Sequence, residues 1–106
     1  CSWVPYWLWR LDEHHEHRET ELKKTIPRRP SEYFQQQCYV SVEADEHQGV
    51  WVATQIGDDN IVFSTDFPHE DSRYPNALDT FLELGFPAET YRKILWDNAA
   101  RYYGFH

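Results

Sequence analysis

The segment Ile61–Ser64 is the feature that most limits how this chain can fold. It is a short, mainly apolar run without polar alternation, which is typical of a strand buried on both faces. Pro68 cannot extend such a strand, so Asp66 and His69 are expected on the loop just beyond its C-terminal end. In parallel α/β architectures, ligands and catalytic groups gather at that end of the sheet. The run therefore predicts both a fold class and a candidate site.

The rest of the pattern predicts helices alternating with strands, which favours parallel strands joined by right-handed crossovers. Ser31–Phe34 is expected to form no more than a turn or a single helical turn, between two longer elements. The expected order is a helix from Trp3 to about Lys24, a strand over Cys38–Glu43, a helix through residues 50–56, the strand over Ile61–Ser64, a helix over 77–82 and a last helix opened by Pro87 and capped near Gly104.

The composition is that of one small domain covering residues 1–106. Hydrophobic residues make up 41% of the 106 residues, which is enough for a core. The formal net charge of −8 makes nucleic acid and anionic membrane surfaces unfavourable partners, and no apolar stretch is long enough to span a bilayer. Cys1 and Cys38 do not resemble a disulfide framework, so we expect reduced thiols in a cytoplasmic protein.

A family resemblance is carried by three blocks of sequence, which are Trp3–Asp12, Tyr39–Glu43, and Ser64–His69 together with Lys93–Arg101. They resemble the C-terminal part of the amidohydrolase-related family 2 proteins, at the segment after barrel strand six, at strand seven, and at strand eight with the closing helix. That family holds metal-dependent (β/α)8-barrel hydrolases and decarboxylases. The resemblance implies an α/β fold: a partial (β/α)8 barrel with two parallel strand–helix units, an N-terminal helix and C-terminal helices.

The resemblance also implies roles for single residues. Asp66 matches the strand-eight aspartate, a metal ligand that can also move protons, and a carboxylate suits Zn²⁺; alternatively, it caps its own loop. Arg10 matches an arginine that approaches the substrate carboxylate in decarboxylases, or it is a surface residue paired with Asp12 or His14. His69 either binds substrate or orients Asp66; alternatively, it is an ordinary loop histidine.

Two polar clusters are weaker candidates. His14 and His17, together with neighbouring glutamates, could bind Zn²⁺ or Ni²⁺, although a solvated helix face is the simpler interpretation. Glu43 and Glu46 could line a pocket as an acid–base pair or stabilise the start of a helix, and we favour the second role.

Two further groups are expected to be structural rather than catalytic. Asn98 is expected to bond to a strand end. The tryptophans Trp3, Trp7 and Trp9 are expected to pack rather than to bind a ligand.

Two functions remain open. The first is the C-terminal part of a metal-dependent hydrolase or decarboxylase acting on a small organic acid, with Asp66 catalytic. It would be inactive alone, because the family's metal-binding histidines lie on earlier strands. Its cofactor would be a divalent metal, zinc first, with none necessarily bound by this chain, and its partners would be the substrate and the missing N-terminal barrel portion. The alternative is a non-enzymatic module that self-associates into a homo-oligomer through open sheet edges.

Overall fold

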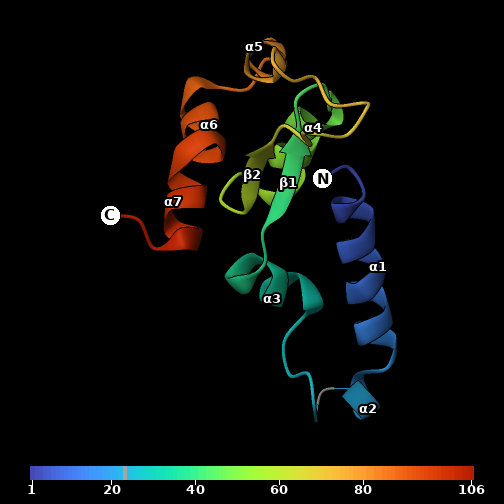
Figure 1. Cartoon of the computed structure of the whole chain (residues 1–106). Coiled ribbons are helices and arrows are strands. Elements are labelled where there is room, and N and C mark those ends of the chain that lie inside the picture. Colours follow the sequence, from blue (N-terminus) through green and yellow to red (C-terminus); the bar gives the residue numbers. More distant parts are fainter. Residues whose placement is uncertain (23) are drawn as a thin grey trace.

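A parallel pair of strands forms the centre of the computed structural model, which describes residues 1–22 and 24–106. Strand β1 (Val40–Glu43) pairs with β2 (Ile61–Ser64) in a register that places Val40 opposite Ile61 and Glu43 opposite Ser64. Helix α4 (Gln48–Ile56) connects them and lies against the sheet (Figure 1). Parallel neighbours need such a crossover, so the expected α/β fold with parallel strand–helix units is confirmed.

The N-terminal part is more broken than the sequence predicts. Helix α1 (Val4–His17) ends at Arg18, and a short α2 (Glu19–Leu22) follows, so the single helix expected from Trp3 to about Lys24 is wrong beyond His17. Lys23 lies outside the described residues. After the buried His15 the residues up to Glu21 are all polar, so the sequence offers no apolar face that packing could stabilise, which explains the early end.

Helix α3 (Pro30–Gln37) is longer than the single turn expected over Ser31–Phe34. Pro30 occupies the first turn, and the Glu32 carboxylate accepts a hydrogen bond from the Arg29 N–H at 2.8 Å. Proline at this position and a reciprocal bond to the capping residue both stabilise a helix start. This local capping extends the helix although its apolar pattern is weak.

The C-terminal helices form one continuous rod beside the sheet (Figure 1). After α5 (Ala77–Leu82), the rod consists of α6 (Ala88–Arg92), a π-helical turn η1 (Lys93–Asp97) and α7 (Asn98–Tyr103). Gly104 ends it with a φ of 72°, as its predicted capping role requires. The π-helical turn was not predicted. Lys93 and Asn98, at the two ends of this wider turn, both donate to Asp58 and therefore lie on the same side of the rod.

The core lies on one face of the sheet. Its fully buried side chains are Val42, Val52, Ile61, Phe81 and Ile94. Of the β2 residues only Ile61 is buried, and the three that follow it are half-buried. The expectation that this strand is buried on both faces is therefore wrong within the described residues, because they cover only one side of the sheet.

The tryptophans of the N-terminal segment are exposed rather than packed. Trp3, Trp7 and Trp9 are 61%, 49% and 55% exposed, so the expectation that they pack is not met within the described residues. Trp3 and Trp7 line an apolar groove of about 480 Å³ between α1 and α3. None of the helices in the described part of the chain has the length and apolar character needed to cross a membrane.

Candidate active site

Asp66 lies two residues beyond β2, at the C-terminal edge of the sheet, where the sequence predicts it. Its φ is 58°, a left-handed conformation that costs an L-residue roughly 1–2 kcal/mol. Residues held in such conformations concentrate at functional sites. The side chain is 38% exposed and can be reached from solvent. Position, conformation and access together make Asp66 the centre of the candidate site.

The backbone around Asp66 is bonded by hydroxyls and amides of its own loop. The Asp66 N–H donates to Ser64 Oγ at 3.2 Å, and the His69 N–H donates to Asp66 O at 2.9 Å. The Ser72 hydroxyl donates to Thr65 O at 2.6 Å. Among the described residues no N–H donates to the Asp66 carboxylate, so the alternative in which it caps the loop is wrong.

The structure brings His69 near Asp66. His69 Nε2 lies 4.0 Å from Asp66 Oδ1, beyond hydrogen-bond distance, and the imidazole is 70% exposed. Arg10 is exposed on α1, and no hydrogen bond or ion pair within the described chain joins it to Asp66. Asp12, the suggested alternative partner of Arg10, instead accepts hydrogen bonds from the N–H and the hydroxyl of Ser31 at 2.9 and 2.6 Å.

The loops that follow β1 and β2 are tied to each other. Arg73 Nε donates to Asp45 Oδ2 at 2.7 Å, although the two residues are far apart in sequence. Nothing in the sequence pattern singles out Arg73 or the neighbouring Ser72, because a polar Asp-Ser-Arg run is typical of any surface loop. The left-handed conformation of Asp66 marks this loop in the structure, but a φ angle cannot be read from the sequence.

Glu46 does not cap the following helix, so that expectation is wrong. The capping position of α4 is His47, and the Glu46 carboxylate accepts hydrogen bonds from the N–H groups of Ser2 and Glu43, at 2.7 and 3.1 Å. Burial acts to raise the pKa of Glu46, but hydrogen bonds from the N-terminal amine, the Ser2 hydroxyl and these N–H groups hold it below its ordinary value. Glu46 therefore joins the N-terminal segment to the turn after β1.

The opposite end of β2 is closed by a separate polar cluster. Asn98 is 1% exposed, and its Nδ2 donates to the carbonyls of Asp58 and Ile61, each at 2.7 Å, which confirms the structural role expected for it. The Asp58 carboxylate accepts from Thr90 Oγ1 and Lys93 Nζ at 2.7 and 2.9 Å. In barrels of this class, the end of the sheet opposite the active site contributes to stability.

Burial acts to raise the pKa of Asp58, but the hydrogen bonds from Lys93 and Thr90 outweigh it and hold that pKa below its ordinary value. The hydrogen bond that Lys93 donates to Asp58, together with the contact to Asp59 at 3.0 Å, raises the pKa of Lys93 above its ordinary value.

The histidines of α1 do not form a metal site. His14 and His17 are exposed, and His17 Nδ1 lies 2.7 Å from the carbonyl of Glu13. The buried residue is His15, whose Nε2 lies 2.7 Å from Ile26 O. Within residues 1–22 and 24–106, no three His, Cys, Asp or Glu side chains are grouped so that they could hold a metal ion. Asp66 thus offers one carboxylate ligand, and these residues alone do not fit a metal.

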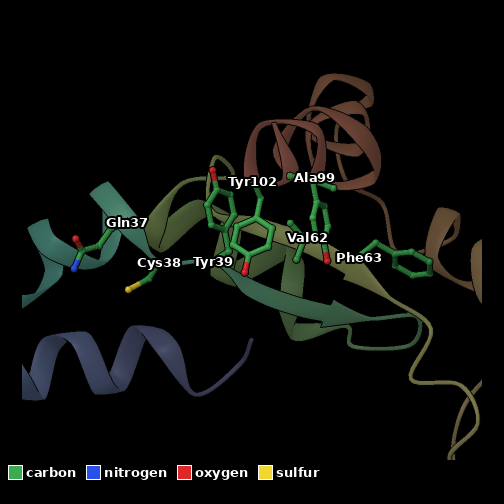
Figure 2. Close-up of a pocket in the computed structure, with 8 residues that line it drawn as sticks. Gln37, Cys38, Tyr39, Val62, Phe63, Ala99 and Tyr102 are labelled. Carbon is green, nitrogen blue, oxygen red and sulfur yellow. The ribbon is translucent and has the colours of Figure 1, made fainter. Parts of the chain in front are cut away.

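A cavity of about 530 Å³ lies between β2 and α7 (Figure 2). Tyr39 and Tyr102 flank it in an edge-to-face pair with ring centroids 5.2 Å apart, and Val62 lines it from the strand. No residue of the loop over 65–76 contributes to its lining, so this cavity is distinct from the candidate site.

Comparison with known proteins identifies the family. The model of the family described as Amidohydrolase matches residues 3–105. The chain belongs to the amidohydrolase family. This confirms the resemblance seen in the sequence, which covers nearly the whole chain.

Decarboxylases are among the proteins to which this chain is similar. Gamma-resorcylate decarboxylase of Polaromonas sp. is 30% identical over 98 residues, which cover 91% of this chain and 29% of that protein. The crystal structure of 5-carboxyvanillate decarboxylase from Sphingomonas paucimobilis matches with a TM-score of 0.74 and 25% identity, over 93% of this chain and 30% of its own.

A third relative was solved with its ligands. Dihydroxybenzoic acid decarboxylase from Polaromonas sp., with bound manganese and the inhibitor 2-nitroresorcinol, matches with a TM-score of 0.67 and 29% identity. The match covers 96% of this chain and 31% of that one. The present chain thus spans less than a third of the length of the decarboxylases it matches, and its strand–helix units correspond to part of their barrel. A divalent metal is therefore present in a close structural relative.

Proposed function

We propose that this chain forms the strand-seven and strand-eight part of a metal-dependent amidohydrolase-family enzyme, either a decarboxylase or a hydrolase of a small organic acid. The observation that carries the proposal is Asp66, a solvent-accessible carboxylate in a left-handed conformation at the C-terminal edge of a parallel sheet. The similarity to decarboxylases of aromatic acids favours an aromatic carboxylate as substrate. That edge is where barrels of this class place their chemistry.

Asp66 is proposed to move a proton during the reaction. Decarboxylation leaves a C–H bond where the carboxylate was, so a group must deliver a proton to that carbon. A positioned carboxyl group performs such transfers, and they typically contribute about 10²–10⁴-fold to the rate. Arg10 and His69 are proposed to bind the substrate: the guanidinium of Arg10 offers paired donors to a carboxylate, and the exposed His69 imidazole lies close to Asp66.

Asp66 is also proposed as the one metal ligand that the chain contributes, with the other ligands supplied from outside the described residues. Carboxylate oxygens bind both Zn²⁺ and Mn²⁺, and we propose zinc. A bound divalent metal supplies Lewis-acid chemistry at such a site. Because a single ligand does not hold a metal, the isolated chain is proposed to have no turnover of its own. Its 106 residues are proposed to form one domain.

A cytoplasmic location is proposed as well. The free thiols of Cys1 and Cys38 support it, because reduced cysteines are the rule in that compartment.

A chimera tests the enzymatic proposal. The segment of Polaromonas gamma-resorcylate decarboxylase that matches this chain is replaced by residues 1–106, and decarboxylation of γ-resorcylate is measured with Zn²⁺ or Mn²⁺ added. We expect turnover by the chimera, and a loss of about 10²-fold or more in kcat for Asp66→Asn. Asp79→Asn, an exposed position on α5, is the matched control and is expected to be neutral. A chimera that keeps full activity with Asp66→Asn would contradict the proposed role.

A self-associating module is the second candidate, and the exposed apolar surface favours it. Within the described chain, β1 and β2 pair only with each other, and Trp3, Trp7 and Trp9 are all about half exposed or more. Such open edges and patches are usually covered by a partner. Sedimentation velocity at rising concentration is expected to show a dimer or larger species; a monomer at all concentrations would rule this candidate out.

A further inference from the structure

The peptide group between Thr65 and Asp66 is bonded at both of its polar atoms by serine hydroxyls. Its N–H, which belongs to Asp66, donates to Ser64 Oγ at 3.2 Å. Its carbonyl, which belongs to Thr65, accepts from the Ser72 hydroxyl at 2.6 Å. Because a peptide group is planar, holding both polar atoms fixes the orientation of the whole unit.

The peptide group on the other side of Asp66 is also held. The Asp66 carbonyl accepts the N–H of His69 at 2.9 Å, and the Phe67 N–H donates to Thr65 Oγ1 at 3.3 Å. The φ and ψ angles of Asp66 are the rotations between these two held planes. Asp66 has a φ of 58° between these two planes, in the left-handed region that only a small minority of non-glycine residues occupy.

Ser72 is itself anchored, and so it can act as a fixed support. Its oxygen accepts the Tyr74 N–H at 3.2 Å. The adjacent Arg73 is tied to Asp45 in the turn after β1 at 2.7 Å. The Ser72 hydroxyl that holds the Thr65 carbonyl is therefore connected, through Arg73 and Asp45, to the turn after β1 as well as to its own loop after β2.

We propose that Ser64 and Ser72 are positioning residues that set the direction in which the Asp66 carboxylate leaves the sheet edge. The inference rests on the proposed function of Asp66. The two serines act through the backbone of Asp66, since the direction of its Cα–Cβ bond follows from the orientation of the two flanking peptide groups. Ser72 is the more informative of the two because it lies six residues away from Asp66 in sequence.

NMR spectroscopy of the isotopically labelled full chain tests this positioning. A residue with positive φ has its amide and α protons unusually close, so Asp66 is expected to give a strong intraresidue NOE between them. In Ser72→Ala we expect this NOE to weaken several-fold as Asp66 leaves the left-handed region. Ser72→Thr keeps the hydroxyl and is expected to retain it. Ser41→Ala, on the exposed face of β1, is the matched control and is expected to change nothing at Asp66.

The readout separates positioning from general stabilisation. A serine that merely stabilises the fold would change the unfolding midpoint and leave the Asp66 NOE unchanged in the folded chain. A strong NOE in folded Ser72→Ala would therefore overturn the proposal. If that variant loses its dispersed amide spectrum, Ser64→Ala removes the acceptor at the other end of the same peptide and is judged by the same criterion. The measurement is independent of the chimera assay, so failure of the positioning and failure of the proposed activity are distinguishable.

Discussion

Arg73 and Asp45 form an ion pair, with Nε 2.7 Å from Oδ2, that joins the loop after β2 to the turn after β1. The pair lies at the same edge of the sheet as Asp66 and connects segments that are distant in sequence. It thereby restrains the loop that carries Asp66 and His69. Both side chains remain substantially exposed, at 59% and 37%, which limits how much the pair can contribute to the free energy of unfolding.

We expect the Arg73–Asp45 pair to stabilise the chain by no more than about 1 kcal/mol, because exposed ion pairs are screened by water and salt. The measurement is a double-mutant cycle with Arg73→Ala and Asp45→Ala, followed by urea unfolding in low and high salt. The coupling free energy should shrink as salt is added. Arg92→Ala with Asp97→Ala, an exposed pair outside the site, is the control cycle. A coupling that persists unchanged in high salt would contradict this interpretation.

Asn98→Ala should lower the free energy of unfolding more than any other polar substitution at the N-terminal end of β2. It leaves the carbonyls of Asp58 and Ile61 without the amide that bonds them, at a site that is 1% exposed. A buried acceptor left unpaired costs about 1–3 kcal/mol. Asn76→Ala, at an exposed position before α5, is the matched control and is expected to change the free energy of unfolding by less than about 0.5 kcal/mol. Equal effects for the two variants would show that the Asn98 bonds are not stabilising.

Stability should fall in acid, in part through Asp58. Its pKa is lowered in the folded chain, so its contribution is present above the unfolded pKa of about 3.9 and is lost as the pH falls through the folded pKa. Lys93 acts in the opposite range, because its raised pKa gives stability that is lost only as the pH rises through that folded pKa. Urea unfolding from pH 7 to pH 2 checks the acid limb.

In that titration, Asp58→Asn is expected to be less stable than the wild-type chain at pH 7 and to show a shallower loss of stability in acid. Asp71→Asn, in the exposed loop, is the control and should keep the wild-type profile. An Asp58→Asn profile parallel to that of the wild type would mean that Asp58 does not carry the linkage.

Asp66→Gly should not destabilise the isolated chain. Glycine adopts a φ of 58° without steric cost, whereas a residue with a Cβ pays up to roughly 1–2 kcal/mol, aspartate less than most. The gain is offset by the larger backbone entropy of glycine in the unfolded chain. We expect a free energy of unfolding within about 1 kcal/mol of the wild type, while Asp66→Ala is destabilised relative to Asp66→Gly. If Asp66→Gly were the less stable of the two, the left-handed conformation would not be a source of strain.

Several elements could be predicted because their signals are local. The apolar run Ile61–Ser64 followed by Pro68 predicts both the strand and its end, and the structure places β2 over the same residues. Gly104 ends the last helix with the positive φ that its residue type allows. Asn98 was expected to reach a strand end, and it does. For β2 and Gly104 the deciding property is intrinsic to the residues or follows from a neighbouring pattern, whereas the bond of Asn98 joins residues that are 37 positions apart.

Other features depend on contacts that sequence proximity does not reveal. The exposure of Trp3 and Trp7 depends on which faces other elements cover, and hydrophobicity alone predicted the opposite. The early end of α1 and the π-helical turn at η1 likewise follow from which side chains find partners.

The sequence by itself determined that a carboxylate, Asp66, follows the end of a strand in a parallel α/β unit, and that the chain resembles amidohydrolase-like barrels. Only the tertiary structure decided how that carboxylate is held. The left-handed backbone of Asp66, the Ser72 hydroxyl on the Thr65 carbonyl and the Arg73–Asp45 pair depend on loops that meet at the sheet edge. Strand pairing brings those loops together, and local secondary-structure propensity does not predict the contact between them.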